Sequence, residues 1–154
     1  MYYKLGDKEK YKALMEAIVE KDPNNPTIFY NLGVTSYEIG NIEAAIKYYN
    51  KALELNPKLT EARLNIAAAI LSGEAAIVEQ MNSLGLSKAD TQKYDELAEQ
   101  RKGLYRKALP YLEKVMENDP ENVEAIRTTM NIYYQLGEAE KAAAAQEKLD
   151  QLQD

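Results

Sequence analysis

One short sequence pattern recurs along the chain and marks where helices end. It contains Pro23, Pro57 and Pro120 in its three copies, and the first two prolines lie 34 residues apart. Gly6 and Gly40 repeat the same 34-residue spacing. The residue before a proline is pushed out of helical backbone space, and glycine readily takes the left-handed conformation that closes a helix. The sequence therefore predicts helices that end alternately at glycine turns and at proline turns.

Apolar residues recur at helical spacing between these turns. Ile28, Leu32 and Ile39 mark one helix, and Ala45, Tyr49 and Leu53 fall on one face of the next. A repeat of 34 residues, made of helix, glycine turn, helix and proline turn, predicts a solenoid of stacked helical hairpins.

The interval between successive prolines is longer in one place. Pro120 follows Pro57 by 63 residues, which is 29 more than one period. The extra segment, near 72–102, keeps helical apolar spacing on both sides of a turn at 83–87 that contains serine and glycine. Ser87 and Asp90 have the spacing of a helix-capping pair. We expect both helices of this repeat to run several turns too long and to pack together as an antiparallel hairpin.

Composition excludes several classes of function. The net charge is -6 and no basic block occurs, which disfavours nucleic acid as a partner. No apolar run is long enough for direct membrane insertion. The chain has no Cys and no His, so thiol nucleophiles, imidazole catalysis and zinc sites are excluded together. We expect no enzyme, no catalytic residue, no cofactor and no metal site.

The segment 26–59 resembles the tetratricopeptide repeat. The family pattern of aromatic, Leu-Gly, Ala, aromatic, Ala and Pro is matched by Phe29, Leu32, Gly33, Ala45, Tyr49, Ala52 and Pro57. Ser36 departs from it, since the family usually has Tyr there. The resemblance implies an all-α, right-handed α-α superhelix, with about 3.5 helix-turn-helix repeats and one elongated helical hairpin.

We expect a single repeat domain over residues 1–154. Its parts are a partial leading repeat at 1–25, a full repeat at 26–59, a stretched repeat at 60–122 with about 29 inserted residues near 72–102, and a C-terminal repeat at 123–154. Because the chain begins inside a repeat, we expect it to be a fragment of a longer array. Residues 60–120 are similar to exported tetratricopeptide proteins of Bacteroidetes, which implies a periplasmic or exported location, with the cytoplasm as the alternative.

The resemblance also implies a concave groove, lined by the first helix of each repeat, that binds a peptide or a partner helix. The matching positions are Tyr30, Asn31, Val34, Tyr37, Glu38, Leu64, Asn65, Arg127, Asn131 and Tyr134, with Gln135 beside them. Asn side chains can bond to both polar groups of a peptide backbone, and Tyr supplies rigid contact area. The competing interpretation is that Tyr30, Asn31 and Tyr37 are merely the family's commonest residues there.

One known use of the family can be tested on the sequence. Chaperone-type members clamp a terminal carboxylate with Lys, Asn, Asn, Lys and Arg. The matching positions here hold Tyr30, Val34, Asn65, Glu124 and Thr128. Only Asn65 agrees, and Glu124 has the wrong charge for an anion, so we expect acidic chaperone tails not to bind.

The leading hypothesis is therefore a protein-interaction scaffold for an unknown protein or peptide. The alternative is a structural or self-association module of a larger repeat protein that uses the hairpin. In that case the tip residues Leu84 and Leu86 contact a partner or a second copy, which gives a homo-oligomer. The simpler interpretation of these leucines is that they cap the hairpin's own small core.

Overall fold

The computed structural model describes residues 5–152, and this part of the chain is all-helical. The helices are α1 (Leu5–Val19), α2 (Pro26–Glu38), α3 (Ile42–Leu55), α4 (Thr60–Leu71), α5 (Glu74–Asn82), α6 (Lys88–Asn118), α7 (Val123–Leu136) and α8 (Ala139–Gln151). The chain divides into two compact units, Met1–Ala69 and Ile70–Asp154, and the boundary falls near the end of α4. The first four residues of the predicted leading repeat lie outside the described range.

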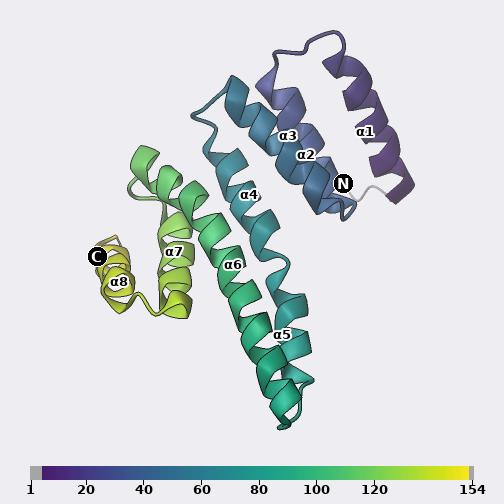
Figure 1. Cartoon of the computed structure of the whole chain (residues 1–154). Coiled ribbons are helices and arrows are strands. Elements are labelled where there is room, and N and C mark those ends of the chain that lie inside the picture. The colour runs from purple at the N-terminus through teal and green to yellow at the C-terminus, as the bar shows by residue number, and fades with distance from the viewer. Residues whose placement is uncertain (1–4, 153–154) are drawn as a thin grey trace. The chain divides into compact units, whose positions relative to one another are not determined.

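The first unit is a stack of helices in chain order, in which α1 packs on α2 and α2 packs on α3 (Figure 1). Its core forms around Ile28, Phe29, Leu32 and Ala52. Partly buried apolar side chains from α1, α3 and the turns close over this core. Helical apolar spacing thus places one face of each helix against its neighbour.

Side-chain amides and glycines define the helix ends that the proline and glycine pattern predicts. Asn25 caps α2 by accepting from the Thr27 amide, and Pro26 follows in the first helical position. Asn41 and Asn122 cap α3 and α7 in the same manner. Gly40 and Gly137 have φ of 81° and 77°, the left-handed backbone that closes α2 and α7.

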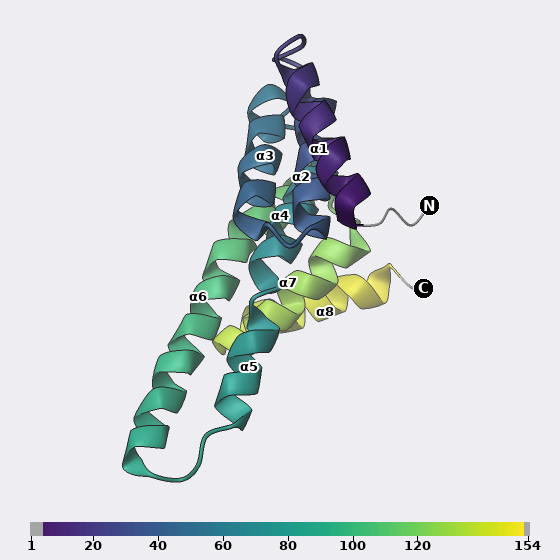
Figure 2. The same ribbon diagram turned by 90° about the vertical axis from the view of Figure 1, so that its right-hand side faces the viewer.

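The second unit contains the predicted elongated hairpin, in which α5 lies beside the first half of α6 (Figures 1 and 2). Helix α6 runs for 31 residues without a break. It opens with a capping box, since the Ser87 side chain accepts from the Asp90 amide and the Asp90 carboxylate accepts from Ser87. The prediction of an all-α repeat fold with one long hairpin is confirmed.

The structure differs from the expectation in one half of that hairpin. The first helix is not continuous, because α4 ends at Leu71 and α5 begins at Glu74. Ser72 and Gly73 form the break, and glycine is among the least favourable residues for a helix interior. The extension therefore consists of a separate short helix packed on one uninterrupted long one.

Helices α2 and α3 approach each other most closely at Gly33. A β-carbon built there would lie 2.5 Å from two ring atoms of Tyr49. Tyr49 is only 2% exposed, so its ring has no free space into which it could retreat. The lack of a side chain at this position is what allows the tyrosine to pack against the backbone of α2.

We predict that Gly33→Ala lowers the free energy of unfolding by about 1–3 kcal/mol, because the added methyl group overpacks a filled core. Gly103→Ala is the matched control, since Gly103 lies within α6 with nothing inside 4 Å of its added β-carbon. That change is expected to stabilise by about 0.5–1 kcal/mol through helix propensity. Urea unfolding of both variants measures the effects, and equal stability changes would contradict the packing argument.

Candidate functional site

In the first unit, three of the aromatic and amide side chains on α2, α3 and α4 form one polar cluster. Asn65 Nδ2 donates to the Tyr30 hydroxyl at 3.2 Å. The Tyr30 ring lies 5.8 Å from the Tyr49 ring, centre to centre, at an angle of 49°. Burial raises the pKa of Tyr49 to about 12, with Tyr30 adding to the effect. The structure thus brings together Tyr30 and Asn65, two of the predicted binding residues, and part of their bonding capacity is used within the fold.

The other predicted residues of this unit are distributed along α2 and α4. Tyr37 and Glu38 are exposed at the end of α2, with Tyr37 showing 39% of its surface. Asn31, Val34 and Leu64 are half-buried. These positions leave Tyr37 as the most accessible large side chain among the predicted contacts of α2.

In the second unit, α7 lines a hollow of about 350 Å³. Its walls are formed by Leu71, Glu74 and Tyr105 together with Thr128, Asn131, Ile132 and Gln135 of α7. Asn131 and Gln135 are exposed, so their amides reach solvent at the hollow. Tyr134 and Arg127, also predicted binding residues, are exposed on α7 without lining this hollow, and Tyr134 shows 54% of its surface.

Glu74 and Tyr105, which line this hollow, form a hydrogen-bonded cluster with Arg101, which does not line it. Glu74 Oε1 accepts from Arg101 Nε at 2.8 Å and from Arg101 Nη2 at 2.5 Å. The Tyr105 hydroxyl donates to the same oxygen. Arg101 also lies over the Tyr105 ring, 5.6 Å from its centre. The cluster fastens the first turn of α5 to the middle of α6.

The surroundings of the Tyr105 hydroxyl favour its protonated form. Burial and the bond to Glu74 raise the pKa of Tyr105 to about 12. The hydroxyl therefore keeps its proton, and remains a donor, throughout the neutral range. Because a tyrosine with raised pKa is stabilised in its protonated form, this contribution is lost only as the pH rises through the folded-state value.

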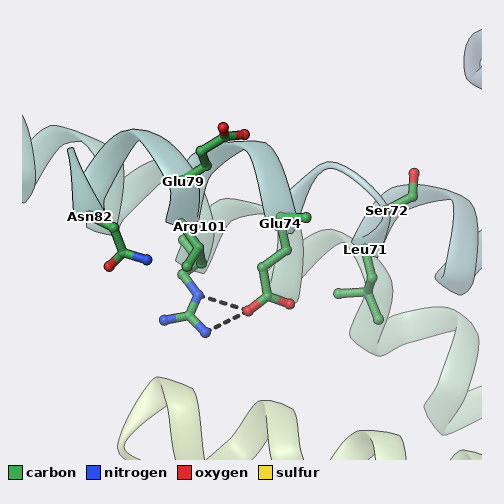
Figure 3. Close-up of a pocket in the computed structure, with 8 residues that line it drawn as sticks. Leu71, Ser72, Glu74, Glu79, Asn82 and Arg101 are labelled. Atoms are coloured by element: carbon green, nitrogen blue, oxygen red, sulfur yellow. Dashed lines mark hydrogen bonds and ion pairs between the residues drawn. The ribbon is translucent and has the colours of Figure 1, made fainter.

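A second hollow, of about 720 Å³, has both partners of the same ion pair in its lining (Figure 3). It is lined by Leu71, Ser72, Glu74, Ala75, Val78, Glu79, Asn82 and Arg101. Glu74 and Arg101 point toward one another, whereas Glu79 points away from them (Figure 3). Leu71 and Glu74 line both hollows, so the two adjoin.

Sequence reasoning missed the cluster of Glu74, Arg101 and Tyr105. The residues are 27 and 31 positions apart, and no local spacing links them. The available signal was a pair of opposite charges on the two helices of the predicted hairpin. The register between those helices, which decides whether the charges meet, depends on the turn and on the break at Gly73.

The described residues contain neither a metal-binding cluster nor a membrane-spanning helix. Among residues 5–152, no group of three or more acidic side chains is arranged to hold a metal ion. No helix in that range is both long enough and apolar enough to span a bilayer.

We predict that Glu74 and Arg101 are energetically coupled. Glu74→Ala and Arg101→Ala are each expected to destabilise the chain, while the double variant loses less than the sum. The expected coupling is about 0.5–1 kcal/mol for a pair whose side chains are 27% and 30% exposed and in which two N–H groups donate to one carboxylate oxygen. A double-mutant cycle by urea unfolding measures it. The surface pair Lys93–Glu96, whose side chains are 49% and 51% exposed, is the control and should show weaker coupling.

Comparison with known proteins supports the repeat architecture. A family model described as tetratricopeptide repeat matches residues 26–59, and two others with the same description match residues 101–152 and 1–25. Among curated proteins, photosystem I assembly protein Ycf3 of Rippkaea orientalis is 32% identical over 114 residues, which cover 73% of this chain and 55% of that protein. Ycf3 of Acaryochloris marina is 39% identical over 74 residues, covering 42% of this chain and 45% of the relative.

The chain thus spans about half the length of the curated relatives it matches. Both relatives are cyanobacterial, and the similarity to exported Bacteroidetes proteins stays a prediction. Among solved structures, the TPR protein YrrB has a TM-score of 0.64 at 21% identity, covering 96% of this chain and 61% of YrrB. MamA of strain MSR-1 has a TM-score of 0.62 at 19% identity, covering 96% of this chain and 68% of MamA. The chain carries tetratricopeptide repeats and has the all-α helical-repeat fold of the proteins built from them.

Proposed function

We propose that this chain is a protein-interaction scaffold that binds a peptide or partner helix at the hollow lined by α7. The observation that carries the proposal is the placement of Asn131 and Gln135. Both side chains are exposed, and both line a hollow of about 350 Å³ whose opposite wall holds Tyr105 and Glu74. Amides in such a place can pair with the N–H and carbonyl groups of a bound backbone.

Tyr134 adds contact area next to these amides. It lies on α7 and is 54% exposed, so no core packing requires it. Tyrosine buries much surface at low entropic cost when a partner covers it. Tyr30 and Asn65 of the first unit are less suited to direct contact, because they already bond to each other.

The relatives agree with a role between proteins. Tetratricopeptide-repeat proteins generally mediate protein–protein interactions, and the two curated relatives are named assembly proteins. We extend this coarse role to the present chain without carrying over the relatives' partner. A scaffold that holds a partner needs no catalytic residues, and the repeat fold favours a non-enzymatic role.

We predict that Asn131→Ala combined with Tyr134→Ala abolishes capture of the physiological partner and leaves the melting temperature unchanged, because both side chains are exposed. The measurement is a comparative pull-down from the source organism with wild-type and variant chains, followed by mass spectrometry. Glu147→Ala, an exposed change on α8, is the control that should retain every captured protein. If the double variant captures the same proteins as the wild type, the proposed site is wrong.

Self-association through the hairpin tip is a second candidate, and one observation favours it. Leu86 is fully exposed, at 102% of its reference surface, whereas Leu84 is half-buried. Leu86 lines a hollow of about 300 Å³ together with the apolar side chains of Met81, Leu84 and Tyr94 and with the polar Asp90 and Thr91. An exposed apolar side chain at the edge of a partly apolar hollow allows two copies to pair by placing each Leu86 against the hollow of the other.

For this candidate we predict a concentration-dependent dimer that Leu86→Ser converts to monomer, since the change removes the exposed apolar group without touching the core. Light scattering after size-exclusion chromatography gives the mass of each form. Lys88→Ser, an exposed change two residues away, serves as the control and should leave the dimer intact. A wild-type chain that stays monomeric at about 1 mM, where even weak specific dimers form, would rule the candidate out.

A further inference from the structure

The hollow on α5, lined by Leu71 of α4 and by five residues of α5, is formed mainly by the inserted helix. Its floor is apolar and consists of Leu71, Ala75 and Val78, spaced by four and three residues. Leu71 and Val78 are half-buried and Ala75 is exposed, so the floor is open to solvent. An apolar floor of this kind gains from contact with an apolar side chain.

The charges around this floor leave a negative surplus. Arg101 contributes one positive charge, but its guanidinium is committed to Glu74 at 2.5 Å and 2.8 Å. The donors of the cluster all converge on Oε1 of Glu74. Glu79 is exposed and makes no ion pair within residues 5–152, and Figure 3 shows it pointing away from the Glu74–Arg101 pair. The lining thus offers one uncompensated carboxylate beside an apolar floor, with the Asn82 amide at its far end.

The α5 hollow is also continuous with the hollow proposed above as a peptide site. Leu71 and Glu74 belong to the lining of both. A chain that lies against Asn131 and Gln135 on α7 therefore has a path onto α5 without leaving the second unit. Continuity makes a single extended ligand a better fit than two unrelated ones.

We infer that the α5 hollow extends the peptide site and takes an apolar side chain flanked by Lys or Arg. This inference rests on the proposed function. The apolar side chain covers Leu71, Ala75 and Val78 and supplies most of the binding. A neighbouring ammonium or guanidinium group approaches Glu79, and this contact decides which peptides are preferred more than how tightly they bind.

Other occupants fit these charges less well. An acidic peptide would place like charge beside Glu79. A second copy of the chain, with a net charge of -6, would bring further negative charge to the same place. The unpaired carboxylate of Glu79 therefore favours a segment of another protein that carries both basic and apolar side chains.

The test uses the full chain, labelled with ¹⁵N, and three capped synthetic peptides. The first is Gly-Ser-Lys-Leu-Lys-Ser-Gly. The second has Glu in place of both Lys, and the third has Ser in place of Leu. We expect the Lys-Leu-Lys peptide to shift the amide signals of Ala75 and Val78 and the side-chain signals of Asn82. The Glu peptide should bind roughly fivefold more weakly or worse, as expected for an exposed charge contact, and the Ser peptide should give no saturable shift.

Two variants test the contribution of the apolar floor and the contribution of the Glu79 charge separately. Ala75→Trp fills the hollow and should abolish the shifts, while Glu79→Lys should remove the preference for the Lys peptide over the Glu peptide. Glu147→Lys on α8 makes the same change of charge away from the hollow and should leave binding and preference intact. Unchanged binding in both Ala75→Trp and Glu79→Lys would overturn the inference.

The failure of this inference can be told apart from the failure of the proposed function. If the Lys-Leu-Lys peptide shifts Thr128 and Asn131 but not Ala75 and Val78, the α7 site stands and the α5 extension is wrong. If no signal moves up to about 5 mM peptide, the extension is wrong, and the pull-down with the Asn131 and Tyr134 variant still decides the α7 site independently.

Discussion

Helices α2 and α3 can pack as closely as they do because position 33 carries no side chain. The Tyr49 ring occupies the space where a β-carbon would stand, 2.5 Å away, and is itself almost fully buried. Ala45 and Ala52, both 0% exposed, keep the rest of α3 equally close to its partner. Small residues at fixed positions thus bring two helices into contact, and one bulky ring fills the remaining space. The pair buries its apolar faces and leaves Tyr37 and Glu38 at the end of α2 exposed to solvent.

The helical order could be predicted from sequence because its determinants are local. Asn caps, left-handed glycines and helix-ending prolines act within a few residues. Asn25 and Gly40 bound α2, and Asn122 and Gly137 bound α7 in the same way. The long hairpin could be predicted because its apolar spacing continues on both sides of the turn at 83–87. The break at Ser72 and Gly73 was not predicted, although Gly73 is visible in the sequence. Helix propensity alone does not decide whether a glycine interrupts a helix, since packing often overrides a cost of about 1 kcal/mol.

Some residues of the candidate site could likewise be predicted from local sequence, and others could not because they depend on tertiary packing. Asn131, Tyr134 and Arg127 are exposed on α7, as helical periodicity and the family pattern imply. The fold uses Tyr30 and Asn65 differently, because they bond to each other across two helices. The cluster formed by Glu74, Arg101 and Tyr105 depends on the register between α5 and α6. That register follows from tertiary packing over about thirty residues and has no local sequence signature.

The inserted helix α5 changes the surface that this repeat presents. A standard repeat presents one row of outward side chains on its first helix, and α7 presents such a row with Asn131 and Tyr134. The break after Leu71 starts a new helix, so α5 contributes a second lining surface with an apolar floor and its own carboxylate at Glu79. The ion pair of Glu74 and Arg101 anchors that surface to α6 and consumes the nearby positive charge. The same contact that holds the insertion in place therefore leaves Glu79 as the unpaired charge of this hollow among the described residues, which is why the ligand we propose for it is basic.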